Sequence, residues 1–81
     1  MAQTTNRPLD MERTPVQSSN LNSVGYDADS SILEIEFHHG GIYQYSGVPS
    51  SVHEELMAAG SKGTYFDQAI KKGGYPYSKV G

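Results

Sequence analysis

Lysines and tyrosines are interleaved near the C-terminus of this sequence. From Lys62 onward there are four lysines and one acidic residue, whereas the chain up to Ser61 has eight acidic residues and two basic ones. Ammonium groups bind phosphates and aromatic rings stack on unpaired bases, so the pattern is typical of a surface for single-stranded nucleic acid. We assign to this candidate nucleic-acid surface Lys62, Lys71, Lys72, Tyr75, Tyr77 and Lys79. An ordinary alternative is that lysines near a helix C-terminus only offset the helix dipole.

A second aromatic pair, Tyr43 and Tyr45, lies two residues apart in a predicted strand. Side chains alternate across a strand, so both rings must lie on the same side of the sheet. They are either a platform on which bases stack or part of the core. Because a chain this short has few other large apolar residues, we expect them to form the core side of a structural hairpin.

The remaining polar residues do not form a catalytic or metal-binding motif. The chain lacks cysteine, which excludes disulfides, cysteine-based zinc sites and thiol nucleophiles. Glu34, Glu36 and His38 lie along one face of a predicted strand, but steps of about 6 to 7 Å are too long for all three to ligate one ion. We expect this face to be solvated. We predict no enzymatic activity, no metal and no cofactor.

The elements that would position these residues follow from hydrophobic periodicity and turn residues. We predict strands over residues 19–26, 32–37 and 42–45, with a glycine turn at Gly40 and Gly41, then helices over 49–59 and 61–70. Strands and helices are segregated along the chain. The predicted fold is therefore α+β: a three-stranded antiparallel β-meander followed by two short helices packed on one face.

With 81 residues and a net charge of -3, the chain supports a single small core. Residues 1–13 have no hydrophobic period and are predicted to be a flexible N-terminal arm, which leaves 14–81 as the folded domain. No apolar run reaches the length of a signal peptide or a membrane span. We therefore predict a cytoplasmic protein without a membrane partner.

Several short motifs in one order resemble the KTSC domain, a small module found alone in bacterial and phage proteins and at the C-terminus of some lysyl-tRNA synthetases. They are Val16-Gln17-Ser18-Ser19-Asn20-Leu21, Gly25-Tyr26-Asp27, Leu33 to Phe37 with Gly40 and Tyr43-Gln44-Tyr45, Gly47-Val48-Pro49, Ala59-Gly60-Ser61-Lys62-Gly63 and Tyr65-Phe66. The resemblance covers about four-fifths of the chain. It implies a domain without established catalytic residues, for which RNA binding is suggested by the synthetase context.

The sequence thus predicts a non-catalytic binding module whose partner is RNA or another single-stranded nucleic acid. The alternative is a protein–protein interaction module of bacterial or phage origin. That module would present the acidic strand face of Glu34 and Glu36, or an exposed sheet edge, to a basic or strand-forming partner.

Overall fold

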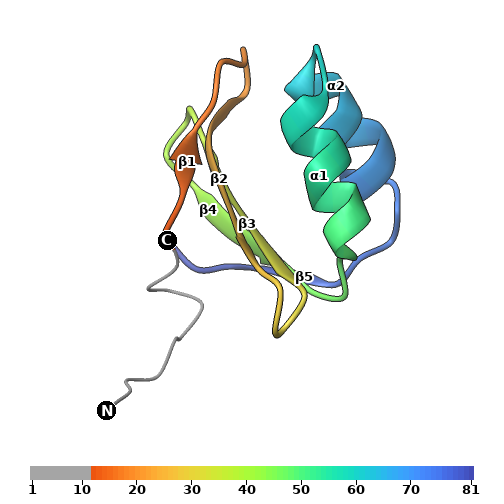
Figure 1. Ribbon diagram of the computed structural model, residues 1–81. Helices are drawn as coiled ribbons and strands as arrows, with labels where there is room; N and C mark the ends of the chain where they lie inside the picture. Colours follow the sequence, from red (N-terminus) through yellow and green to blue (C-terminus); the bar gives the residue numbers. More distant parts are fainter. Residues whose placement is uncertain (1–11) are drawn as a thin grey trace.

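A computed structural model describes residues 12–81 as two layers, a twisted antiparallel sheet and a layer of helices on one of its faces (Figure 1). The sheet has five strands in the order β1-β2-β3-β4-β5, each paired with its sequence neighbour. Their bounds are Thr14–Pro15 (β1), Leu21–Asp27 (β2), Ile32–Phe37 (β3), Ile42–Tyr45 (β4) and Tyr77–Lys79 (β5). The predicted α+β class and its antiparallel meander are confirmed.

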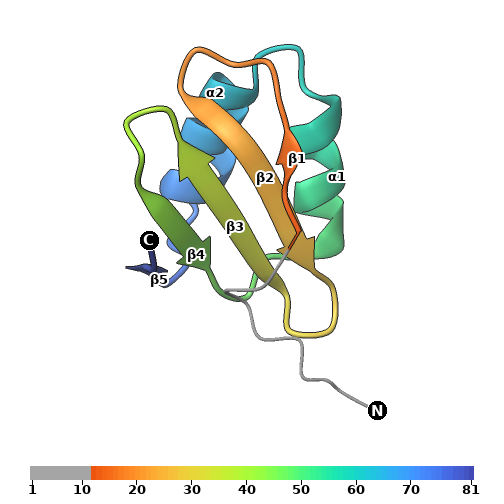
Figure 2. The same ribbon diagram turned by 90° about the vertical axis from the view of Figure 1, so that its left-hand side faces the viewer.

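The strand count is five rather than the predicted three, because one short strand is added at each edge (Figure 2). Strand β1 pairs Thr14 with Val24, and β5 pairs Tyr77 with Tyr45. Both edge strands are exposed and only two or three residues long, so they have no apolar alternation that a sequence pattern would detect. Of the predicted arm, residues 1–11 lie outside the described part of the chain.

The turn between β3 and β4 depends on glycine. Gly40 has a φ of 104°, which is unfavourable for other residues, and its N–H donates to the Phe37 carbonyl at 2.9 Å. A Cβ on Gly41 would lie 2.9 Å from the His39 ring and 3.0 Å from the Tyr43 ring. Gly40 therefore provides the backbone conformation of the turn, and Gly41 leaves room for the His39 and Tyr43 rings beside it.

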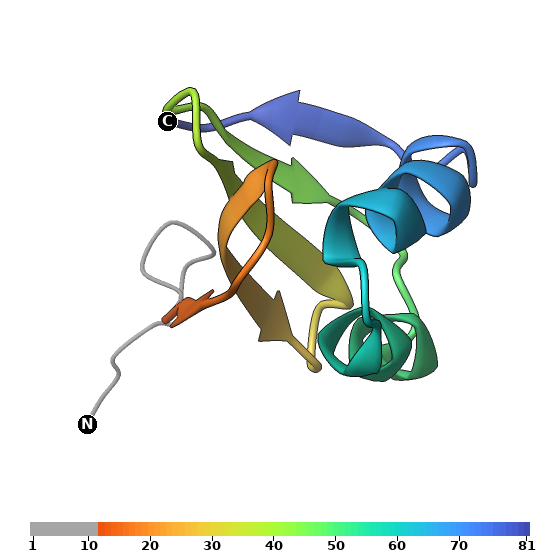
Figure 3. The same cartoon turned by 90° about the horizontal axis from the view of Figure 1, so that it is seen from above.

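The helices lie between β4 and β5 in sequence and pack on the same face of the sheet (Figure 3). Helix α1 spans Ser50–Ala58, with Pro49 at its N-cap, and α2 spans Lys62–Tyr65, with Ser61 at its N-cap. Helix α2 continues directly into η2, a π-helix over Phe66–Lys71. The two predicted helices are thus confirmed in place, but the second one changes its hydrogen-bonding period halfway.

The core lies between the sheet and the helices. Its buried residues come from β2, β3, β4, the loop before α1, and all of the helices except α2: Leu21, Val24, Leu33, Ile35, Tyr45, Val48, Leu56, Phe66 and Ile70. Tyr45 is buried and Tyr43 packs partly buried against this core. The prediction that both rings lie on the core side of the sheet is confirmed.

The opposite face of the sheet carries a polar network, and here one prediction is wrong. Glu34, expected in solvent, is fully buried. Its carboxylate is paired with the Arg13 guanidinium and accepts a hydrogen bond from Gln44 at 2.8 Å. Arg13 also donates to the Ser23 hydroxyl at 2.9 Å. The sequence pattern failed because the arginine that covers this face comes from outside the strand.

The neighbouring Glu36 stays partly exposed and completes the network. Its carboxylate accepts hydrogen bonds of 2.8 Å from the Asn22 amide and from the Ser23 hydroxyl. These two hydrogen bonds, and the Arg13 charge to a smaller extent, hold the pKa of Glu36 below its usual value against an opposing effect of burial. Both glutamates are thus engaged within the domain, which removes Glu34 from any acidic docking face.

Candidate ligand-binding groove

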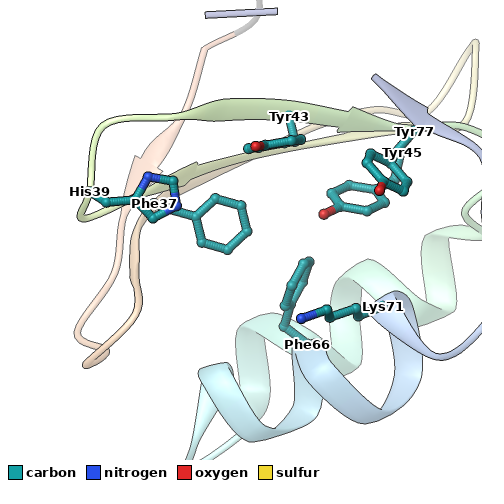
Figure 4. Close-up of a pocket in the computed structure, with 7 residues that line it drawn as sticks. All are labelled: Phe37, His39, Tyr43, Tyr45, Phe66, Lys71 and Tyr77. Atoms are coloured by element: carbon teal, nitrogen blue, oxygen red, sulfur yellow. The ribbon is translucent and has the colours of Figure 1, made fainter. Parts of the chain in front are cut away.

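A groove opens between the β3–β4–β5 side of the sheet and η2. It has two adjoining lobes. The first, which we call the aromatic lobe, has a volume of about 290 Å³ and is lined by Phe37, His39, Tyr43, Tyr45, Phe66, Lys71 and Tyr77 (Figure 4). The second, which we call the polar lobe, has a volume of about 350 Å³ and is lined by Ser19, Asn20, Phe37, His38, His39, Gly63, Phe66, Asp67 and Lys71. Four residues line both lobes, so the groove is continuous.

Strand register explains why so many rings meet in the aromatic lobe. Tyr45 lies opposite Leu33 on one side and opposite Tyr77 on the other, and residues directly opposite each other share a face of the sheet. In the same way Tyr43 lies opposite Ile35 and Lys79. Strand β5 therefore adds Tyr77 and Lys79 to the face that the helices cover only in part.

The rings contact one another at the distances of edge-to-face and tilted aromatic pairs. The Phe66 ring meets Tyr45 at a centroid distance of 5.5 Å and Phe37 at 5.4 Å, both nearly perpendicular. Tyr77 lies 6.0 Å from Tyr43 and 5.4 Å from Tyr45. Among residues 12–81, Tyr77 is the exposed large hydrophobic side chain, with 64% of its surface in solvent. The lobe thus has a fixed aromatic floor and one open ring at its rim.

The phenol groups give the lobe hydrogen-bonding capacity. Burial, together with the nearby Tyr77 and Tyr43, raises the pKa of Tyr45 to about 12, so its hydroxyl stays protonated and can donate a hydrogen bond at neutral pH. Figure 4 shows the rings of Tyr43, Tyr45 and Tyr77 gathered on the sheet side of the cavity, across from Phe66 and Lys71. Among residues 12–81, no carboxylate lines this lobe, and the Lys71 ammonium is its charged group.

The π-helix positions the opposite wall. Its wider turn is marked by the Lys72 N–H, which donates at 3.2 Å to the Asp67 carbonyl, five residues back. In an α-helix, residues five apart point about 140° away from each other. The wider turn of η2 reduces this angle, and Phe66 and Lys71 both line the groove while Ile70 remains buried.

The six residues of the predicted nucleic-acid surface do not form one cluster. Lys71 and Tyr77 line the aromatic lobe, and Lys79 is directly paired with Tyr43 beside it. Lys62 donates instead to the Ala59 carbonyl at 3.1 Å, and Lys72 lies 3.6 Å from the Asp67 carboxylate. Tyr75 is partly buried and packs against the core, close to Gly73.

Several groove residues escaped the sequence analysis. Phe37 and Phe66 were named only within the family motifs and His39 was not assigned to the candidate nucleic-acid surface, yet His39 stacks on Phe37 with a centroid distance of 5.4 Å and an interplanar angle of 4°. Nothing in the sequence indicated that Asn20 lines a groove, and it was named only as part of a motif. The usable signal was the co-occurrence of His38-His39-Gly40-Gly41 with the tyrosines of the next strand, which places a histidine at the hairpin end of the aromatic face.

Within residues 12–81 no group of three histidine, cysteine, aspartate or glutamate side chains is placed to hold a metal ion. The helices of this part of the chain are also too short and too polar to cross a bilayer.

A five-stranded sheet with helices on one face and an aromatic groove at their junction defines a small α+β domain, and the comparisons with known proteins give its family. Residues 17–75 match the KTSC domain, so the chain belongs to the KTSC family. The crystal structure of a KTSC domain protein from Yersinia pestis has the same fold, with a TM-score of 0.82 and 49% sequence identity, over 88% of this chain and 99% of that one.

Two kinds of sequence relatives stand out. An uncharacterized protein of Stutzerimonas stutzeri is 43% identical over 86% of this chain and 99% of its own length. A lysine–tRNA ligase of Nostoc sp. is 39% identical over 79% of this chain, which corresponds to only 11% of the ligase. The domain therefore occurs both as nearly a whole protein and as a small part of a much longer one.

Proposed function

We propose that this protein is a non-catalytic cytoplasmic module that binds unpaired RNA in the aromatic lobe. The observation that carries the proposal is the exposed Tyr77 ring at the rim, set beside Tyr43 and across the lobe from the Lys71 ammonium. Single-stranded nucleic acid is bound by this combination of aromatic rings for bases and cations for the backbone.

The energetics favour a ligand with both features. A base stacked on an aromatic ring contributes about 1 to 3 kcal/mol, and each neutralised phosphate adds a salt-dependent contribution. Lys71 on the helix side and Lys79 on the β5 side flank the rings. The lining that the described part of the chain gives to the aromatic lobe contains a lysine and no carboxylate, which suits an anionic ligand. The match to a lysine–tRNA ligase, a protein that by its name acts on tRNA, adds support.

Titration of the whole chain with a short single-stranded RNA at about 50 mM and 200 mM salt tests the proposal. We expect saturable binding whose association constant falls as salt rises, with a slope of about -0.7 for each phosphate contacted. Absence of binding, or binding indifferent to salt, would contradict it.

A protein-interaction module is a second candidate, and the same rings favour it. Aromatic-lined grooves with hydrogen-bond donors also bind proline-rich segments in the polyproline II conformation. Such a segment would stack on Tyr43 and Tyr77 and accept hydrogen bonds from phenol groups. A pull-down from native lysate, with and without nuclease, separates the two candidates. A protein partner is retained after nuclease treatment, whereas RNA-bridged material is lost.

A further inference from the structure

The polar lobe is built by two segments far apart in the sequence. One is the loop before β2, which supplies Ser19 and Asn20, and the other runs from α2 into η2 and supplies Gly63 and Asp67. The β3–β4 turn closes the lobe with His38 and His39. Both the Ser19-Asn20 and the Gly63 segments lie within the residues that match the KTSC domain, and the aromatic lobe uses neither of them.

The loop before β2 is held in a defined conformation. The Ser18 hydroxyl accepts hydrogen bonds from the backbone N–H groups of Asn20 and Leu21, each at 3.2 Å. The His38 ring contacts the Ser18 carbonyl at 2.7 Å, and the His38 N–H donates to the Asn20 carbonyl at 2.9 Å. The loop is therefore tied to the hairpin, and the Asn20 side chain leaves from a fixed backbone.

Gly63 makes room for that side chain. A Cβ at Gly63 would lie 3.2 Å from the Asn20 amide nitrogen and 3.5 Å from the Ser18 hydroxyl oxygen, closer than the amide tolerates without moving. Glycine at this position lets the amide rest against the helix start. The lobe thus presents a carboxamide, the hydroxyl of Ser19 and the carboxylate of Asp67 around one space.

We propose that the polar lobe reads the edge of one base while the aromatic lobe stacks the base next to it. This inference rests on the proposed function. A carboxamide both donates and accepts, which is how proteins recognise the hydrogen-bonding edges of unpaired bases. Stacking on the aromatic rings accepts any base, so we assign the base preference to the hydrogen-bonding groups of the polar lobe.

The shared residues fix the size of the ligand. Lys71 and His39 line both lobes and lie at their junction. A strand that places one base in each lobe brings its linking phosphate to this junction, where the Lys71 ammonium binds it. The smallest full ligand is therefore two consecutive unpaired nucleotides, and a single nucleoside monophosphate occupies only half of the groove.

The experiment compares oligo(A), oligo(C) and oligo(U) of equal length on the whole chain, with Asn20→Ala, Tyr77→Ala and a control, Gln68→Ala. Gln68 is an exposed amide on η2 that lines neither lobe. We expect the unaltered protein to prefer one oligomer by about three- to tenfold, the effect of one or two hydrogen bonds. Asn20→Ala removes the base preference, and Tyr77→Ala weakens the binding of all three oligomers by the same factor. Gln68→Ala changes neither the affinity nor the base preference.

The outcomes separate this inference from the proposed function. Equal binding of the three oligomers, or an even loss for all of them in Asn20→Ala, overturns the base-reading lobe and leaves RNA binding standing. No binding of any oligomer, with binding of a proline-rich peptide instead, overturns both. Asn20→Ser, which keeps a polar side chain in the loop but removes the amide, is the second variant, and unfolding curves establish that each variant is folded.

Discussion

Phe66 and Lys71 lie five residues apart and line the same groove because the segment that joins them is a π-helix. An α-helix over these residues would stack Ile70 above Phe66 and turn Lys71 about 140° away. Single π-turns inside helices are often found at functional sites. The aromatic and cationic halves of the groove thus depend on one irregular helical segment, which ends at Lys71 with Lys72 as its C-cap. In the turn that follows, a Cβ on Gly73 would clash with the Ala69 carbonyl oxygen.

The orientation of Lys71 leads to a prediction that distinguishes it from its neighbour. Lys71→Ala should weaken RNA binding and reduce the salt dependence by about 0.7 in slope, the equivalent of one phosphate on a single strand. Lys72→Ala is the matched control, since its ammonium is directed to Asp67 and its side chain is 70% exposed outside the groove. Fluorescence titrations at several salt concentrations measure both slopes. Equal losses in the two variants would mean that the site is a diffuse lysine surface and not this groove.

Tyr77 allows the ring and the hydroxyl to be tested separately. Tyr77→Ala should weaken RNA binding by about 1 to 3 kcal/mol, because a stacked base loses its ring. Tyr77→Phe should retain most of the affinity. Because the side chain is 64% exposed, Tyr77→Phe should unfold near the same urea concentration as the original protein. Tyr77→Ala should lose at most about 0.5 to 1.5 kcal/mol of stability for each ring contact, with Tyr43 and with Tyr45. A loss in Tyr77→Phe as large as in Tyr77→Ala would assign recognition to the hydroxyl instead of stacking.

Sequence periodicity was sufficient for the part of the fold that has a long apolar pattern. The alternation from Ile32 to Phe37 and the parity of Tyr43 and Tyr45 placed the core side of the sheet correctly. Strand β5 was missed because Tyr77–Lys79 has no apolar face of its own. It forms because its backbone pairs with β4, a long-range partner that local propensity does not describe.

The candidate groove was harder to anticipate for a related reason. The pattern of lysines and tyrosines identified Lys71 and Tyr77 but could not distinguish Lys71 from Lys72. The direction of each lysine side chain depends on the π-helix, whereas the sequence analysis assumed the 3.6-residue period of an α-helix. Glu34 was misplaced because alternation reports which side of a strand a residue takes, not what covers that side. Arg13, separated from Glu34 by 21 positions, provides the cover.

The buried Glu34 gives a stability prediction. Glu34→Ala leaves the Arg13 guanidinium and the Gln44 amide without their acceptor inside the sheet network. Removing one partner of a buried pair costs about 3 to 5 kcal/mol, and we expect the lower end because the Arg13 side chain keeps 25% exposure. Urea unfolding measures the change. The control is Glu54→Ala on the exposed face of α1, which should cost within about 0.5 kcal/mol. Similar costs for the two variants would show that the network does not stabilise the fold.

Glu36 predicts how that stability depends on pH. Its hydrogen bonds from Asn22 and Ser23 hold its pKa in the folded state below the ordinary value of 4.5. The unfolded chain therefore binds a proton first as pH falls. The stabilising contribution is complete above the unfolded pKa and is lost as pH falls from about there through the folded pKa.

Urea unfolding of the original protein and of Glu36→Gln between about pH 6 and pH 3 isolates this contribution, because the other carboxylates are common to both. The original protein should be the more stable of the two above pH 4.5, and its advantage should shrink steadily as the pH is lowered, since protonation turns its carboxylate into a neutral group like the amide. A direct measurement follows the Glu36 carboxyl resonance by NMR, with a midpoint expected below 4.5. A constant advantage across the range, or a midpoint at or above 4.5, would contradict the network as the cause.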